Sequence, residues 1–91
     1  MPRFMVERTF PDGLTIPTNA QGRETTSKVA EKNAEVGVTW VHSYVTADRR
    51  KTYCIYDGPD AESIRKAAER NGLPVDNIVP VSVLDPYFYN V

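Results

Sequence analysis

Three side chains of this 91-residue chain could bind a metal ion or move a proton: Glu7, His42 and Cys54. The histidine and the cysteine are the sole members of their types. Together the three offer oxygen, nitrogen and sulfur donors, a mixed set that late transition metals such as nickel, copper or zinc accept. We therefore predict these residues as ligands of a divalent transition metal, provided that the fold brings them together.

Each of the three side chains also has another interpretation. A lone histidine is more often an interfacial side chain, here one hydrogen-bonded to Glu7, than a sufficient metal ligand. Glu7 in an apolar cleft would have a raised pKa, as suits a general base, but it could equally pair with Arg3. Cys54 could be a nucleophile with His42 as its base, although free cysteines are more commonly buried and inert.

The elements that must position these residues follow from apolar runs and turn residues. β-Branched and aromatic residues predict four strands, and charged, helix-permissive segments predict two helices. In chain order they are strand 3–10, helix 20–36, strands 38–46 and 51–57, helix 59–71 and strand 77–84. This order is that of the ferredoxin-like βαββαβ fold of α+β class, in which two helices cover one face of a four-stranded antiparallel sheet.

Residues at the element boundaries support this assignment. Gly37 suits the position after the first helix, and Asn71 with Gly72 ends the second. Pro59 is expected at the first position of the second helix. Residues 1–91 are predicted to form one domain, and the tail around Tyr87 could add a further strand.

Strand parity predicts which side chains the helices leave uncovered, because alternate residues point to opposite faces. In the second strand the small, largely aliphatic set of Val41, Ser43 and Val45 suits the core. Its alternate residues are therefore expected on the open face: Trp40, His42 and Tyr44.

In the first strand Phe4 and Val6 belong inside, so Met5 and Glu7 face outwards.

The register of the hairpin decides which residues of the third strand lie on the open face. A three-residue loop at 47–49 would place Cys54 opposite His42 on the open face, whereas a four-residue loop would place Tyr53 and Ile55 there. We favour the shorter loop, because Ile55 would then join Val41 in the core. Glu7, Cys54 and His42 would form a row across three neighbouring strands.

An open face of this kind is too apolar to remain in contact with water. Its predicted lining consists of Trp40, Tyr44, Tyr56 and Met5. We therefore expect a homodimer in which two sheets meet face to face, with the Tyr87 tail wrapping the partner and the metal row in or beside the interfacial cleft.

The composition of the chain limits the classes of binding partner and indicates the cellular compartment. The net charge of −1 offers no general attraction to nucleic acid, and the basic run Arg49-Arg50-Lys51 precedes a strand without the glycines of an RNA-recognition motif. No stretch approaches the roughly 20 apolar residues that span a membrane. A lone cysteine fits a reducing compartment, so we expect a cytoplasmic protein of bacterial origin.

Several segments resemble a known family. They are PRFMVERTFP (2–11), WVHSYV (40–45), TYCIYD (52–57) with Pro59, and VLDPY (83–87). With these motifs, nearly the whole chain is similar to small bacterial ferredoxin-like domains labelled nickel-binding-protein-like. The resemblance implies a ferredoxin-like fold, dimerisation and nickel binding in at least some members, but it transfers no ligand set. Residues 14–27 depart from the alanine- and glutamate-rich helix expected there.

The leading hypothesis is a dimeric, non-enzymatic protein that binds Ni²⁺ or a similar divalent ion through His42, Glu7 and Cys54. The alternative is a small-molecule binder or cofactor-free enzyme of monooxygenase or isomerase type. In it Glu7 or His42 would act as acid or base, beside an apolar wall of aromatic side chains in the dimeric cleft.

Overall fold

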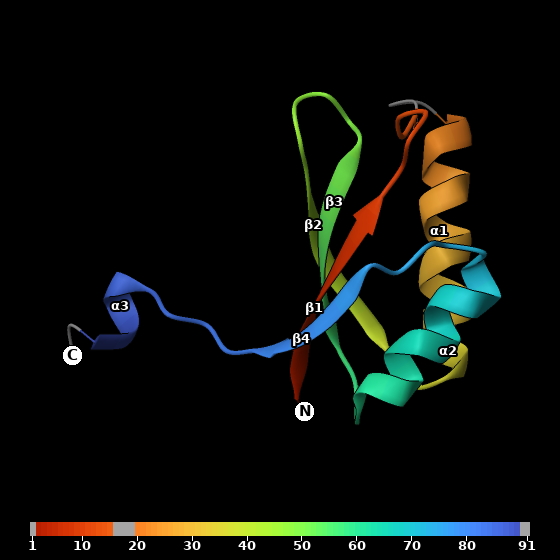
Figure 1. The fold of residues 1–91 in the computed structure, drawn as a ribbon. Helices are drawn as coiled ribbons and strands as arrows, with labels where there is room; N and C mark the ends of the chain where they lie inside the picture. The colour runs from red at the N-terminus through yellow and green to blue at the C-terminus, as the bar shows by residue number, and fades with distance from the viewer. Residues whose placement is uncertain (1, 16–19, 90–91) are drawn as a thin grey trace.

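The computed structural model describes residues 2–15 and 20–89 and shows the predicted order of elements. The elements are β1 (Arg3–Thr9), α1 (Ala20–Glu35), β2 (Thr39–Val45), β3 (Lys51–Asp57), α2 (Ala61–Asn71), β4 (Asn77–Val81) and α3 (Pro86–Tyr89). The strands form one antiparallel sheet in the order β2-β3-β1-β4. Helices α1 and α2 lie on the same face of this sheet (Figure 1). The ferredoxin-like prediction is confirmed.

The two central strands alternate strictly between the two faces of the sheet. In β1, Phe4 and Val6 are buried, and in β3, Cys54 and Tyr56 are buried beside them. They meet Ile64 of α2, which is 1% exposed, to form the main core. The helices therefore cover one set of strand residues and leave the intervening set on the opposite face, called here the open face.

Several predicted boundaries shift in the structure, and the last strand ends at Val81 instead of residue 84. Helix α2 begins at Ala61, because the Asp60 side chain accepts a 2.8 Å hydrogen bond from the Ser63 backbone N–H and so acts as the N-cap. Pro59 therefore precedes the helix instead of occupying its first position. Up to residue 89 the tail does not add a strand, since residues 86–89 form the four-residue helix α3.

Glycine ends both longer helices, as predicted. Gly37 has a φ of +75° and Gly72 a φ of +65°, the left-handed conformation in which glycine avoids the cost of a Cβ. After α1, the Val38 N–H donates to the Asn33 carbonyl at 3.0 Å. The predicted polar connection at 14–19 lies partly outside the described residues.

The β2–β3 hairpin has the four-residue loop, not the favoured three-residue loop. Thr46 N–H donates to the Lys51 carbonyl at 3.0 Å, which leaves residues 47–50 as the loop. The Asp48 carboxylate accepts hydrogen bonds from the Thr46 hydroxyl at 2.7 Å and the Arg50 N–H at 3.0 Å. Arg49 completes the turn with a φ of 60°. These local hydrogen bonds stabilise the longer loop, which moves β3 by one residue against β2.

The register places Cys54 opposite Ser43, while Ile55 lies opposite His42. The prediction that Cys54 faces outwards beside His42 is therefore wrong, as is the prediction that Ile55 belongs to the core. Cys54 is 7% exposed and Tyr56 is 4% exposed, and both lie beneath the helices.

A β-bulge in β2 turns Trp40 to the helical side, so the prediction that Trp40 lies on the open face is wrong. Trp40 pairs with Tyr56, and the next paired residue, His42, lies opposite Ile55, so Val41 is an extra residue. A bulge of this kind reverses the side-chain alternation that precedes it. Trp40 therefore packs against the core on the helical side, where its Nε1–H donates to Ser43 Oγ at 2.9 Å.

Pro80 lies in β4, an edge strand that pairs with β1 alone. An edge strand tolerates proline, because one side of it requires no backbone donor. Within the described part of the chain, no helix is both long and apolar enough to cross a bilayer.

Candidate functional site

Two rows of side chains run across the open face, from β2 through β3 and β1 to β4. Cross-strand pairing defines the first row as His42, Ile55, Met5 and Val79. It defines the second as Tyr44, Tyr53, Glu7 and Asn77. The first row is apolar apart from its histidine, whereas the second combines two phenols with a carboxylate and an amide.

His42 and Tyr44 lie together at the β2 edge of this face. Their ring centroids are 5.0 Å apart and their planes meet at 83°, an edge-to-face arrangement. Both side chains are exposed, and Tyr44 retains 63% of its accessible surface. The imidazole is therefore held by one aromatic neighbour and can be reached from outside the chain.

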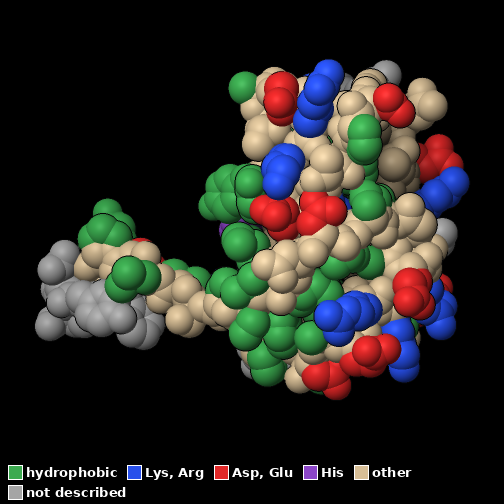
Figure 2. Space-filling view, in the orientation of Figure 1, with side chains coloured by type: hydrophobic (Ala, Val, Ile, Leu, Met, Phe, Trp, Pro, Cys, Tyr) green, Lys and Arg blue, Asp and Glu red, His purple; other side chains and the backbone are tan. Residues whose placement is uncertain are grey.

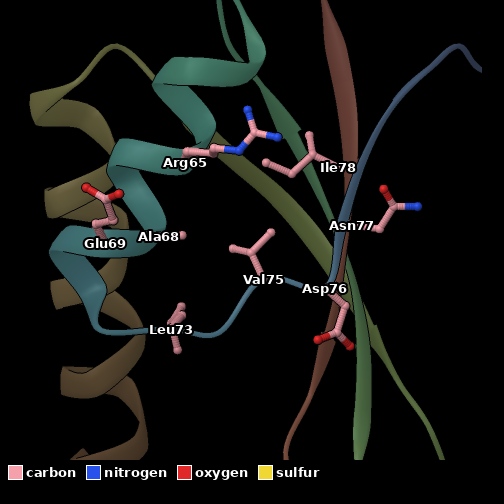
Figure 3. A pocket seen from close by; sticks show the side chains of 8 residues that line it. All are labelled: Arg65, Ala68, Glu69, Leu73, Val75, Asp76, Asn77 and Ile78. Atoms are coloured by element: carbon pink, nitrogen blue, oxygen red, sulfur yellow. The ribbon is translucent and has the colours of Figure 1, made fainter.

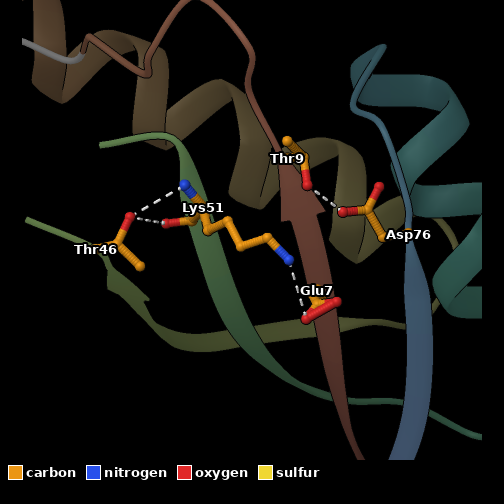
Figure 4. Close-up of polar contacts among 5 residues, drawn as sticks. All are labelled: Glu7, Thr9, Thr46, Lys51 and Asp76. Atoms are coloured by element: carbon orange, nitrogen blue, oxygen red, sulfur yellow. Dashed lines mark hydrogen bonds and ion pairs between the residues drawn. The ribbon is translucent and has the colours of Figure 1, made fainter. Parts of the chain in front are cut away.

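Glu7 does not converge with His42 within one chain. Strand β3 separates the two strands that carry them, and two strand spacings amount to about 9–10 Å. The Glu7 carboxylate instead forms an ion pair with Lys51 of β3, at 3.5 Å between Oε2 and Nζ (Figure 4). Donors to one metal each lie about 2 Å from the ion, so the two groups as placed do not share one.

A second polar contact borders Glu7 on the β4 side. The Thr9 hydroxyl donates a hydrogen bond to the Asp76 carboxylate, next to the start of β4 (Figure 4). The Asp76 carboxylate is thus hydrogen-bonded to Thr9, and the Glu7 carboxylate is ion-paired with Lys51.

Cys54 lies on the opposite side of the sheet from both of the other predicted ligands. Its thiol contacts the Thr52 hydroxyl at 3.5 Å in a buried position. Among residues 2–15 and 20–89, no three or more His, Cys, Asp or Glu side chains are arranged to hold a metal ion. A single copy of the chain therefore does not form the predicted three-ligand row.

The apolar lining of the open face was predicted in part. Met5 and Tyr44 lie there as expected, whereas Trp40 and Tyr56 lie on the helical side for the reasons given above. Tyr53, Ile55 and Val79 take their places. The four-residue loop, which the sequence left open as an alternative, would have indicated Tyr53 and Ile55, because it turns these two residues of β3 to the open face. Val79 follows from its pairing with Met5.

The chain after β4 leaves the domain on the side of the open face and extends away from it (Figure 1). This segment carries apolar side chains with little cover: Val83 is 51% exposed, Leu84 78% and Tyr87 86%. Figure 2 shows hydrophobic side chains on a projecting arm, separate from the body of the domain. Within the described residues, an apolar arm and an incompletely covered apolar sheet face thus lie on one side of the molecule.

A cavity of about 330 Å³ lies elsewhere, between α2 and the segment that leads into β4. It is bordered by Arg65 and Glu69 of α2 and by Val75, Asp76 and Asn77 (Figure 3). It contains none of the predicted site residues.

Comparison with known proteins identifies relatives of the chain. The profile of the family described as "Nickel responsive protein SCO4226-like" matches residues 4–81. The chain is also similar to the crystal structure of SCO4226 from Streptomyces coelicolor A3(2), with a TM-score of 0.70 and 22% sequence identity. That alignment covers 91% of this chain and 99% of the other. At this identity the structural likeness shows the shared fold. No curated protein matches the chain.

Proposed function

The chain belongs to the SCO4226-like family of nickel-responsive proteins, and from this premise we propose that it is a non-enzymatic homodimer that binds Ni²⁺ or a related divalent ion. In this proposal the open face is the dimer interface and His42 is the principal ligand. The observation that carries it is the position of the sole histidine, exposed on the one sheet face that the helices leave uncovered.

The projecting arm supports a second copy as the partner. A chain segment with exposed Leu84 and Tyr87 gains stability when these side chains are buried. The arm leaves on the side of the open face, so a copy seated on that face would meet it (Figure 1). A twofold axis would bury both arms by the same contacts, as in most homodimers.

Dimerisation would also supply the further metal ligands that one chain lacks. One imidazole is a weak site for Ni²⁺, but two copies present two imidazoles and two Glu7 carboxylates at the shared face. Imidazole suits nickel, and carboxylates can complete its coordination. Cys54 is left out of this proposal, because its thiol is buried on the other side of the sheet.

Calorimetric titration of tag-free protein with NiCl₂ tests the proposal. We expect saturable binding, and we expect His42→Ala to weaken it by more than the roughly 10- to 100-fold that loss of an outer-shell partner costs. Tyr44→Phe is the matched control, since it preserves the aromatic contact with the imidazole. Absence of saturable binding, or equal affinity in His42→Ala, would refute the proposed site.

The enzyme alternative expects an apolar wall of Trp40, Tyr44 and Tyr56 facing Glu7 and His42. Tyr44 lies beside His42 on the open face, but Trp40 and Tyr56 lie on the opposite side of the sheet. The open face therefore lacks two of the three aromatic side chains that this alternative requires.

A further inference from the structure

We propose that a cavity on the helical side of the sheet binds a small organic anion, a carboxylate with a compact apolar body, and that Arg8 recognises its charge. The cavity has a volume of about 270 Å³ and lies between the sheet, α1 and the segment that follows β1. It is separate from the proposed nickel site, which lies on the opposite face.

Most of the cavity wall is apolar or aromatic. Phe10 and Leu14 border it from the segment after β1, Val29 from α1, and Trp40 and Tyr56 from the sheet. Its volume lies just below the range of about 300–1,000 Å³ that is usual for small-molecule sites. The lining and the size together favour a ligand with one ring or a short aliphatic chain.

Arg8 is the charged residue in this wall. It is 2% exposed, and its Nε and Nη1 atoms have no hydrogen-bond partner among the described residues. Burying an unpaired guanidinium charge is costly. Buried polar groups in proteins are nearly always paired, so two unpaired guanidinium nitrogens at a cavity indicate a missing partner.

The surroundings of Arg8 compensate its charge only in part. The guanidinium carbon lies 5.6 Å from the centre of the Tyr56 ring, within the range of a cation–π interaction. In the described structure, the ion pairs of the chain involve other residues and none includes Arg8.

A carboxylate fits this position best. Its two oxygens match the planar N–H donors of a guanidinium, and the attraction strengthens where apolar walls exclude water. The polar atoms elsewhere in the wall are mainly hydroxyls, and the Ser43 hydroxyl already accepts the Trp40 indole N–H. The rest of the ligand is therefore expected to be apolar.

Trp40 provides the measurement, because it lines the cavity and is the sole tryptophan of the chain. Phenylacetate and its neutral analogue phenylacetamide are titrated while tryptophan fluorescence and amide NMR shifts are followed. We expect saturable phenylacetate binding that is at least about tenfold tighter than binding of the amide. Equal affinity for both probes, or no saturation by millimolar phenylacetate, would overturn the proposal.

Two variants separate charge recognition from simple filling of the cavity. Arg8→Met should remove the preference for phenylacetate while it leaves phenylacetamide binding unchanged, and Arg65→Met, on the surface of α2, is the control that should bind as wild type. Val29→Phe keeps Arg8 but fills the cavity, and should weaken both probes. Circular dichroism establishes that each variant is folded. If Arg8→Met does not fold, loss of both probes in folded Val29→Phe supports the site, and undiminished binding there overturns it.

Discussion

His42 lies directly opposite Ile55 in the β2–β3 ladder, and the pair continues through Met5 to Val79 across the open face. The sole imidazole of the chain thus stands at the end of an apolar row. The proposed dimer contact and the proposed metal site at its edge both rest on this relationship. It also separates His42 from the thiol, which the same register turns beneath the helices.

Replacement of Cys54 by alanine distinguishes the observed register from the one that places the thiol beside His42. Because the side chain is buried beneath the helices, we expect Cys54→Ala to lower the free energy of unfolding by about 1 kcal/mol. Nickel affinity should be unchanged in calorimetric titration. Loss of nickel binding in the folded variant would place the thiol in the site and contradict this arrangement.

The projecting arm is expected to stabilise the proposed dimer. Leu84 is 78% exposed in the single chain, so Leu84→Asp should cost the fold little while placing a charge where the partner is expected. Analytical ultracentrifugation should show dissociation at protein concentrations where the wild type is dimeric. Val75→Asp is the matched control, because Val75 is 37% exposed at the segment before β4, away from the open face. A monomeric wild type, or a fully dimeric Leu84→Asp, would contradict the role of the arm.

Tyr56 should make the protein sensitive to alkaline pH. Burial raises the pKa of Tyr56 from 10.0 to about 12, although the nearby Arg8 charge opposes the rise. A pKa that is higher in the folded state stabilises the fold below pH 10, and this contribution is lost as the pH rises through about 12. Urea unfolding of the wild type should therefore show stability falling over this range.

The comparison uses one tyrosine variant. Tyr56→Phe should show a flatter dependence of unfolding free energy on pH over the same interval, because the ionisable phenol is absent. A Tyr56→Phe curve as steep as that of the wild type would show that this phenol does not control the alkaline behaviour.

Local sequence signals were sufficient for most of the fold. Apolar runs and turn residues placed the strands and both helices, and Gly37 and Gly72 ended the helices where expected. The start of α2 was misplaced, because Pro59 and Asp60 are both favourable near a helix N-terminus and the Asp60 hydrogen bond to Ser63 decides between them. Met5 and Glu7 were placed correctly, since β1 contains no irregularity.

The order of elements, the antiparallel topology and the presence of a face that two helices do not cover could all be predicted from residue patterns. These properties depend on patterns of many residues, so no single position could alter them. The face that receives Trp40, Cys54 and Tyr56 depends on the pairing of the strands, because strand alternation has a period of two and a shift of one residue reverses it. One extra residue at Val41 and one more loop residue before β3 each reversed a side-chain set. The same two shifts removed Cys54 from the predicted metal row and brought Trp40 and Tyr56 to the cavity beside Arg8.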